Sequence, residues 1–441
     1  MELPDAVTAI AERVHSSGGR ALLVGGCVRD ALLGVASCDF DIAVSLPPQQ
    51  LLALFPTADA LDARLGTLRL PYERGTLVVT TFREEGGYED HRHPTYVRFV
   101  TDVAQDAQRR DFTCNALYFD PRTRELLDPC GGQEDLAARR LRTIGDPERR
   151  FTEDPLRILR GIRFAASAGL AVVPQTLAAM QRCAALLTHL SSERVYDELT
   201  RAFTGGHRGR ALRLTIESGA ASVVLPEVVP MDGVPQPPEY HPEGDVLTHV
   251  CLVLDHVPPG NAALSWAAVL HDVGKPPTFE RASDRIRFTG HDTLSAEMAD
   301  AVLRRFHAPA ALRELVVEIC RDHIRFAVLP EMTPGKRERW MRSPSFRSHL
   351  TFHRADCLGS HGKLDIHDKA VRWLAELLPL PPPPLCTGKD VLALGVPAGP
   401  KVGEFLRLLN ERLESMPSAG RDQALSILAE IVASGVKPLD T

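Results

Sequence analysis

The chain has 441 residues, enough for three or four domains, and its 44% apolar and 24% charged residues are ordinary for a globular protein with sizeable cores. Its formal net charge of -6 excludes a uniformly basic surface, but it is compatible with a local nucleic-acid-binding patch. No apolar run approaches the roughly 20 residues that span a bilayer, no signal peptide is evident, and the nine cysteines lack a Cys-x-x-Cys pair, so we expect a cytoplasmic protein with reduced thiols and no membrane contact.

The first 135 residues predict a small α/β or α+β domain, because short β-like runs alternate with turns and short helices. The expected strands are residues 21–24, 40–44, 77–82, 97–100 and 116–119.

Residues 136–225 predict a helical neck, since apolar residues recur there at helical spacing. The expected helices are 155–167, 175–187, 192–203 and 209–218. A proline-rich linker at 225–245 leads into a histidine-studded helical region, assigned to 226–378. A proline run at 379–384 predicts a stiff spacer, and the domain 379–441 ends in a helical tail.

A Gly-Gly turn and two alternating aspartates occur within one short strand–helix–strand stretch. Gly25 and Gly26 let backbone N–H groups approach an anion, and the helix expected at 27–33 offers an N-terminus that favours phosphate. Asp39 and Asp41 share one face of the next strand, so their carboxylates repel each other unless a cation lies between them. Mg²⁺ prefers such ligands and usually shares them with substrate phosphates. Each part alone would be an ordinary turn or strand edge, but their order predicts a metal-assisted triphosphate site.

Arginine supplies almost all of the positive charge, and we attribute the global excess to genomic base composition. Locally, the segment Arg109-Arg110-Asp111 predicts either neutralisation of a triphosphate with recognition of a ribose hydroxyl, or an ordinary surface salt-bridge cluster. A second cluster comprises Arg139, Arg140, Arg142, Arg149, Arg150, Arg157, Arg160 and Arg163.

The stretch that follows Thr152 predicts a helix start with Thr152 as its N-cap. Glu153 and Asp154 then lie four and three residues before Arg157, so their side chains would share one helical face. One interpretation is a helix-start ion pair that contributes roughly 0.3–0.5 kcal/mol. The other interpretation is that a carboxylate and a guanidinium recognise the edge of one base. The protein's own side chains would then select the nucleotide without a nucleic-acid template.

Together these motifs resemble, in order, those of the class II tRNA nucleotidyltransferase/poly(A) polymerase family, which includes the bacterial CCA-adding enzymes. The resemblance runs through most of the chain. The matching segments are 25–30 with Asp39-x-Asp41, 109–116 for ribose recognition, 128–147 for the hinge, 153–157 for nucleotide selection, and 192–199.

The resemblance implies that Asp39 and Asp41 are catalytic and hold two Mg²⁺ ions. One ion would activate an RNA 3′-hydroxyl and the other would steady the triphosphate. It also implies phosphate contacts from the glycine turn, ribose contacts from the Arg110 segment and base selection by Asp154 with Arg157. The predicted nucleotide-binding residues are Gly25, Gly26, Arg29, Arg110, Asp111, Asn115, Asp154, Arg157, Arg160 and Arg163.

Two features refine the resemblance. Relatives often carry an acid two residues before the position of Thr80, but this chain has Val78 there, so the third carboxylate is left open, with Asp111 as one candidate. Residues 83–94 resemble the family's flexible loop, which CC-only members lack in part. Its presence disfavours a CC-only enzyme without separating full CCA addition from A addition or poly(A) synthesis.

The histidine region resembles the HD phosphohydrolase superfamily in the order His, His-Asp, further His, then Asp. The predicted metal ligands are His249, His271, Asp272 and Asp356, for a divalent ion such as Mg, Mn, Ni or Co. His291 and His323 lie between them in the sequence. Some bacterial tRNA nucleotidyltransferases carry such a domain with 2′,3′-cyclic phosphodiesterase or phosphatase activity, and both a catalytic and a vestigial structural site are compatible with the pattern.

The predicted fold class is therefore α+β: a small nucleotidyltransferase head, then an all-α neck and body with an HD-type domain. The predicted function is template-independent addition or repair of CCA at the tRNA 3′ end from CTP and ATP. The alternatives are an A-adding enzyme or poly(A) polymerase of the same family, or a metal-dependent phosphohydrolase whose head only binds nucleotide or RNA. A pure RNA-binding module ranks last, and the oligomeric state is left open.

Overall fold

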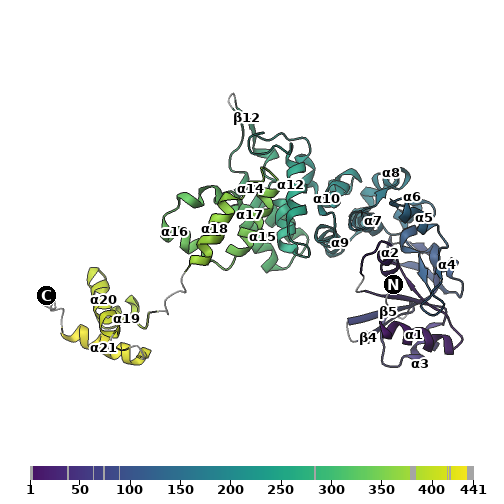
Figure 1. Ribbon diagram of the computed structural model, residues 1–441, viewed down its shortest axis with the longest axis horizontal. Coiled ribbons are helices and arrows are strands. Elements are labelled where there is room, and N and C mark those ends of the chain that lie inside the picture. The colour runs from purple at the N-terminus through teal and green to yellow at the C-terminus, as the bar shows by residue number, and fades with distance from the viewer. Residues whose placement is uncertain are drawn as a thin grey trace. The chain divides into compact units, whose positions relative to one another are not determined.

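A computed structural model describes residues 3–36, 39–62, 64–72, 75–88, 90–282, 285–377, 384–414, 416 and 419–434 (Figure 1). Cys38 of the first motif, Glu89 of the flexible loop and residues 379–383 of the proline run lie outside these ranges. The chain divides into two compact units, Met1–Val371 and Arg372–Thr441. The division into four domains at 135, 225 and 378 stays a prediction.

The head contains a seven-stranded mixed sheet in the order β3-β4-β5-β2-β1-β8-β9, in which β2 and β5 are parallel. Its strands are β1 (Ala21–Val24), β2 (Asp41–Val44), β3 (Asp59–Asp62), β4 (Thr67–Tyr72), β5 (Gly75–Thr81), β8 (Tyr118–Phe119) and β9 (Leu126–Leu127). The strand expected at 116–119 is shorter than predicted, because the preceding Thr113–Asn115 form a 3-10 helix, η1. The run at 97–100 belongs instead to a separate hairpin of β6 (Arg83–Tyr88) and β7 (Pro94–Phe99).

Both faces of the central strands are buried, and the pleat divides their side chains between two cores. Leu23 and Ile42 pack in one cluster with Val7 of α1 (Asp5–Ser16). Leu22 and Ala43 pack in the other. Helices α1 and α3 (Pro48–Leu54) lie beside the sheet in Figure 1. Packing on both faces holds β1 and β2 rigidly, and the glycine turn and Asp41 are at their ends.

Helices dominate the rest of the first unit. Those nearest the sheet are α2 (Gly26–Leu32), α4 (Val103–Gln108), α5 (Gly132–Ala137), α6 (Pro147–Glu153), α7 (Leu156–Ser167), α8 (Pro174–Cys183), η2 (Ala184–His189), α9 (Ser192–Thr204) and α10 (Arg208–Glu217). Those further along are α11 (Ala221–Val224), η3 (Pro226–Met231), α12 (Val246–His256), α13 (Ala262–Leu270), η4 (Pro276–Thr278), α14 (His291–Arg305), α15 (Ala310–Asp322), η5 (His323–Glu331), α16 (Pro334–Met341), α17 (Phe346–Leu358) and α18 (Asp365–Glu376). Two further ribbons pair β10 (Arg140–Leu141) with β11 (Ala171–Val172), and β12 (Phe279–Arg281) with β13 (Ile286–Phe288).

One predicted helix start is wrong. Thr152 lies inside α6, and the chain breaks at Asp154, whose extended backbone ends α6 before α7 begins at Leu156. The break follows from Pro155, because a proline disfavours helical backbone at the residue before it. The predicted helix at 175–187 is also divided, into α8 and the 3-10 helix η2.

The second unit has a small core of its own. Its helices are α19 (Gly388–Ala393), α20 (Pro400–Glu414) and α21 (Arg421–Ser434). Val391, Leu409 and Leu428 are buried together in it. A capping box in which Thr387 and Asp390 bind each other's backbone begins α19.

Candidate active site

The glycine turn brings the chain ends of two strands to one point. Gly25 ends β1 and caps α2 with φ of 81°, a left-handed conformation that glycine adopts without strain. A Cβ placed on Gly25 would lie 3.8 Å from Oδ2 of Asp41 and 4.0 Å from Nη1 of Arg110. The turn, a predicted metal carboxylate and a predicted nucleotide-binding arginine therefore converge.

The two aspartates that the sequence predicts to be catalytic lie at the start of β2. Asp39 and Asp41 are exposed while Phe40 and Ile42 are buried, which confirms the predicted alternation, although the strand begins at Asp41 and not at residue 40. Desolvation by the surrounding protein and the charge of Asp39 raise the pKa of the Asp41 carboxyl, while Arg110 and Arg160 oppose that rise. A divalent cation between the two carboxylates would remove this repulsion, so the pair fits Mg²⁺.

No acidic side chain occupies the register position beside Asp41 on the parallel strand. Val78 of β5 pairs directly with Asp41 there. Asp111, the candidate for a third carboxylate, has both oxygens engaged: Oδ1 accepts hydrogen bonds from the Phe112 N–H and Asn115 Nδ2, and Oδ2 accepts one from Arg160. These bonds fit a structural role for Asp111 better than direct metal ligation.

A hydrogen-bonded chain joins the predicted nucleotide-binding residues of the head to those of α7. Arg29 Nη1 donates to Asn115 Oδ1 at 2.8 Å, and Asn115 Nδ2 donates to Asp111 Oδ1 at 3.0 Å. Arg160 Nε donates to Asp111 Oδ2 at 2.9 Å. Although burial opposes ionisation, Arg160 and these donors hold the pKa of Asp111 below its usual range.

Three predicted arginines also surround a single aromatic ring. The guanidinium carbons of Arg29, Arg160 and Arg163 lie 4.9, 5.1 and 4.2 Å from the ring centroid of Phe164. Glu198 of α9 binds Arg163 at 2.7 Å. Cation–π contacts and carboxylates therefore fix all three guanidinium groups.

A metal-type cluster of a different kind lies in the helical body. Nε2 of His249 is 3.2 Å from Nε2 of His271, 3.2 Å from Oδ1 of Asp356 and 3.6 Å from Oδ2 of Asp272. Nε2 of His271 is 3.3 Å from Oδ2 of Asp272 and 4.0 Å from Oδ1 of Asp356. Thus α12, α13, the turn after α13, and α17 bring the four predicted metal ligands together.

The other oxygen of Asp272 faces a second set of ligands. Its Oδ1 lies 3.6 Å from Nε2 of His291 and 3.7 Å from Nε2 of His323, and these two nitrogens are 3.3 Å apart. Within the described part of the chain, this buried Oδ1 accepts no hydrogen bond. An orphaned buried carboxylate oxygen facing two imidazole nitrogens fits a metal ion, so Asp272 with His291 and His323 would hold an ion.

Hydrogen bonds to backbone carbonyl groups fix which ring nitrogens face these sites. His271 Nδ1 lies 2.9 Å from the Ala268 carbonyl oxygen, and His323 Nδ1 lies 2.7 Å from that of Cys320. A carbonyl only accepts, so each Nδ1 donates and each Nε2 is left as the metal-facing lone pair. Burial lowers the pKa of His323 to about 4, which keeps this imidazole in the neutral form that binds metals.

Comparison with known proteins agrees with this two-part geometry. Family models match a Poly A polymerase head domain at residues 21–142, a probable RNA and SrmB-binding site of polymerase A at 169–231, and an HD domain at 248–356. A multifunctional CCA protein of Nitrosospira multiformis is 34% identical over 309 residues, which are 69% of this chain and 73% of that protein. The chain belongs to the tRNA nucleotidyltransferase/poly(A) polymerase family.

Other family members match over different shares of their length. The CCA-adding enzyme of Oceanobacillus iheyensis is 42% identical over 202 residues, or 46% of this chain, and the match spans about half (50%) of that relative. A solved structure of the Bacillus stearothermophilus CCA-adding enzyme in complex with CTP is 26% identical with a TM-score of 0.70, covering 98% of this chain and 99% of that one. A tRNA nucleotidyltransferase complexed with a primer tRNA and an incoming ATP analogue shares the fold, with 20% identity, a TM-score of 0.56, and 84% and 98% coverage.

The nucleotide-selecting motif of the family is arranged differently from the prediction. Arg157 does not share a helix with Glu153, yet Glu153 Oε2 accepts its hydrogen bond at 2.9 Å across the break between α6 and α7. Asp154 accepts a hydrogen bond from the Leu156 N–H at 3.1 Å and lies 3.6 Å from Arg194. The predicted common helical face of Asp154 and Arg157 is therefore wrong, because Pro155 separates the two helices.

Asp106 is a site residue that the sequence interpretation missed. Its buried carboxylate binds Arg109 at 2.8 Å, Arg110 at 3.2 Å and the Tyr118 hydroxyl at 2.7 Å. Despite burial, the two arginines lower the pKa of this carboxyl. Asp106 precedes Arg109 and Arg110 by three and four residues, a helical spacing that was the available signal.

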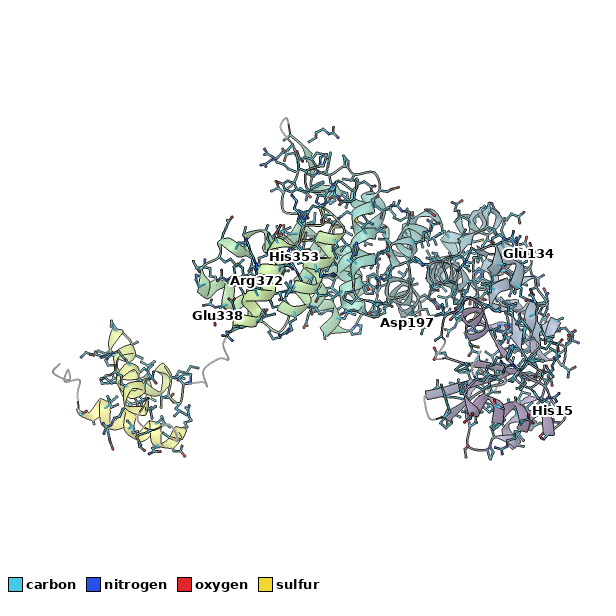
Figure 2. All side chains as sticks on the ribbon, viewed as in Figure 1. His15, Glu134, Asp197, Glu338, His353 and Arg372 are labelled. Atoms are coloured by element: carbon cyan, nitrogen blue, oxygen red, sulfur yellow. The ribbon has the colours of Figure 1, made fainter. Side chains whose placement is uncertain are left out.

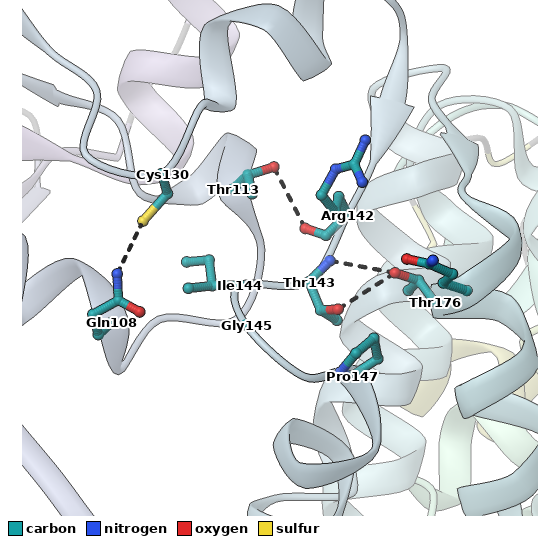
Figure 3. A pocket seen from close by; sticks show the side chains of 10 residues that line it. Gln108, Thr113, Cys130, Arg142, Thr143, Ile144, Gly145, Pro147 and Thr176 are labelled. Carbon is teal, nitrogen blue, oxygen red and sulfur yellow. Dashed lines mark hydrogen bonds between the residues drawn. The ribbon is translucent and has the colours of Figure 1, made fainter.

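A cavity of about 280 Å³ lies at the hinge segment that the family resemblance identified (Figure 3). Thr143 and Thr176 share hydrogen bonds at one side of it, while Gln108 donates to the Cys130 sulfur at the other. None of the predicted nucleotide-binding or metal-binding residues lines the cavity. The cavity therefore lies apart from the predicted active-site residues.

The structure also bears on the expectations about the cysteines and about membrane-spanning helices. The eight cysteines in the described ranges are free thiols, as predicted. Across the same ranges, the helices are all too short or too polar to cross a membrane.

Proposed function

We propose that this protein is a template-independent tRNA 3′-nucleotidyltransferase that adds or repairs CCA from CTP and ATP. The observation that carries the proposal is the convergence of Asp41 and Arg110 at Gly25, beside the arginine network of α7. Relatives named CCA-adding enzyme and multifunctional CCA protein, and a solved relative in complex with CTP, support the nucleotide and the product.

The head would supply the chemical step. Asp39 and Asp41 would hold Mg²⁺, which when bound promotes attack by the RNA 3′-hydroxyl and neutralises charge on the triphosphate. The Gly25–Gly26 turn and Arg29 would receive phosphate oxygens. Arg110 would meet the nucleotide at a fixed position, because Asp106 and Tyr118 hold its guanidinium.

The neck would choose the base. We assign base recognition to Asp154 and Arg157, as the family motif implies. Arg194 of α9 holds Asp154, and Glu153 of α6 holds Arg157, so the two groups are positioned independently. A carboxylate and a guanidinium held this way can present an acceptor and paired donors to one base edge.

A primer-extension assay tests the proposal. Transfer RNAs ending at the discriminator base, at C and at CC are incubated with Mg²⁺ and CTP, ATP or both. We expect CCA to be completed on all three. Extension of the CC-ending tRNA alone would instead identify an A-adding enzyme. Continued addition of A would identify a poly(A) polymerase. Failure to extend any of the three tRNAs would refute the proposal.

The HD cluster supports a second activity, hydrolysis of phosphate esters. The observation that favours it is Asp272, whose two oxygens face two separate ligand sets. Divalent ions such as Mg, Mn, Ni or Co held there would polarise a phosphoryl oxygen and activate water. The test is hydrolysis of 2′,3′-cyclic AMP and p-nitrophenyl phosphate with each metal, in the wild type and in His271→Ala/Asp272→Ala; equal rates would refute a hydrolytic site.

We expect both reactions to take place in the cytoplasm, where tRNA and nucleoside triphosphates are available and free thiols stay reduced. The expected partners are the tRNA 3′ end, CTP and ATP.

A further inference from the structure

A third group of metal-type side chains lies outside the HD cluster, between α15 and α17. Glu318 and Asp322 are one helical turn apart on α15, and His349 faces them from α17. One ligand atom from each residue lies within 4.8 Å of the other two. From this geometry we infer that Glu318, Asp322 and His349 form a separate binding site for a transition-metal ion of the Zn²⁺ type.

The buried histidine is the observation that points to a ligand. His349 is 1% exposed, and in the described part of the structure neither of its ring nitrogens makes a hydrogen bond. Its Nε2 lies 3.3 Å from Oε1 of Glu318, in a geometry that is not a hydrogen bond. A buried imidazole whose nitrogens form no hydrogen bond of good geometry is costly, and a metal ion shared with the facing Glu318 carboxylate would satisfy it.

The spacing also suits the coordination that Zn²⁺ prefers. Bonds of roughly 2.0–2.2 Å in a tetrahedral arrangement place neighbouring ligand atoms about 3.3–3.5 Å apart. The separation between His349 and Glu318 already has this value. Burial lowers the pKa of His349, which leaves its imidazole neutral and able to donate a lone pair.

Neighbouring groups hold the two carboxylates in place. The Ser345 hydroxyl donates to Oε1 of Glu318 at 2.6 Å, and Arg325 binds Oδ2 of Asp322 at 3.4 Å. Arg325 also lies over the Trp340 ring at 4.4 Å. The two carboxylates outnumber this one guanidinium, so the site retains the excess negative charge that attracts a cation.

An ion at this site would join α15, which ends just before His323, to α17, which carries Asp356. Asp322 immediately precedes His323, and His349 lies seven residues, about two helical turns, before Asp356 on α17. The inference therefore concerns a structural metal that fixes α15 against α17. It is independent of the proposed transferase activity.

Zinc stoichiometry of the full-length protein tests the site. EDTA-treated wild type, His349→Gln and Glu318→Gln are titrated with Zn²⁺ by calorimetry, and the metal retained after desalting is counted by mass spectrometry. We expect each variant to bind one equivalent fewer than the wild type, with HD binding unchanged. Circular dichroism verifies folding, and Glu318→Gln, at a half-exposed position, keeps the test decisive if His349→Gln misfolds.

The matched control is His353→Gln. His353 is also a buried histidine of α17, one turn further on; Figure 2 labels it within the helical body. It stacks on Phe326 with ring centroids 4.2 Å apart and faces the Cys357 thiol, so it lies outside the proposed triad. His353→Gln should retain the full number of zinc ions. Equal stoichiometry in the wild type, His349→Gln and Glu318→Gln would overturn the inference.

Discussion

The two predicted metal centres of this chain differ in how completely the protein assembles them. Asp39 and Asp41 are exposed at the start of β2, with a valine on the neighbouring strand where a third acid might be placed. His271 and Asp272 are both 1% exposed, and four further ligand groups converge around them, those of His249, His291, His323 and Asp356. We therefore expect the head pair to need ligands from outside the protein, and the HD cluster to retain an ion without substrate.

This difference matches the chemistry of the ions. Mg²⁺ gives up water reluctantly and is commonly held by one or two carboxylates together with substrate phosphates. Imidazole-rich sets favour transition metals, which stay bound between turnovers. In the head, carboxylates hold several arginines in position, and these would supply positive charge to the proposed triphosphate.

Substitution of Asp41 should have the largest effect on the head and none on the HD cluster. In Asp41→Ala, loss of the metal carboxylate should lower the rate of tRNA extension on the order of 10³-fold or more, because metal activation supplies several kcal/mol of the barrier reduction. Single-turnover primer extension measures this rate. Hydrolysis by the HD cluster and its metal content should stay at the wild-type level; a matching fall in both would show that the two centres are not independent.

The reciprocal change is Asp272→Asn, which removes the carboxylate that faces both HD ligand sets. We expect loss of bound metal and a fall of at least about 100-fold in phosphate-ester hydrolysis, since even outer-shell partners of a metal contribute 10- to 100-fold. Elemental analysis after desalting and the hydrolysis assay measure the two effects. Transferase activity should remain, so a loss of extension comparable to that of Asp41→Ala would contradict the comparison.

Asp106 provides a test that concerns stability. Asp106→Asn leaves Arg109 and Arg110 without their buried carboxylate, and removing one partner of a buried ion pair costs roughly 3–5 kcal/mol. The pKa of Asp106 is lower in the folded protein than in the unfolded chain, where it is about 3.9. Its contribution is therefore complete above that value and disappears as the pH falls below it.

Denaturant unfolding at several pH values measures this contribution. The difference in unfolding free energy between wild type and Asp106→Asn should be constant from about pH 7 to pH 5 and shrink below about pH 4. A difference that grew at low pH would show that Asp106 is not held as a carboxylate.

Local patterns predicted the parts of the molecule that depend on neighbouring residues. The strand at 21–24, the helix after Gly25 and the alternation around Asp41 all appear, because turn chemistry and a two-residue period determine them. The four HD ligands also converge as the motif order implied. Fold class followed from the change of periodicity after residue 135.

Local sequence patterns could not predict side-chain contacts between different helices and strands. Asp106 and Tyr118 meet around Arg110 through the packing of α4 on the sheet, and the helical spacing of Asp106 from the two arginines does not show that this aspartate is buried. The pairing of Asp154 with Arg194 likewise depends on how α9 packs beside α7. The predicted helix start at Thr152 is wrong for the same reason, because Pro155 ends one helix and begins the next.

The smallest expected effect comes from making the head pair more like the HD cluster. Val78→Asp would place a third carboxylate opposite Asp41 in the register of β2 and β5. Like charges on neighbouring strands cost roughly 0.2–1 kcal/mol without a cation, so the variant should be slightly less stable in EDTA. Bound Mg²⁺ would turn the repulsion into attraction, so half-maximal extension should occur at a Mg²⁺ concentration a few-fold lower, as expected for about 1 kcal/mol. Val78→Asn, which adds the same shape without the charge, should leave the Mg²⁺ dependence unchanged; an equal shift in both variants would mean that Val78 does not face the metal-binding pair.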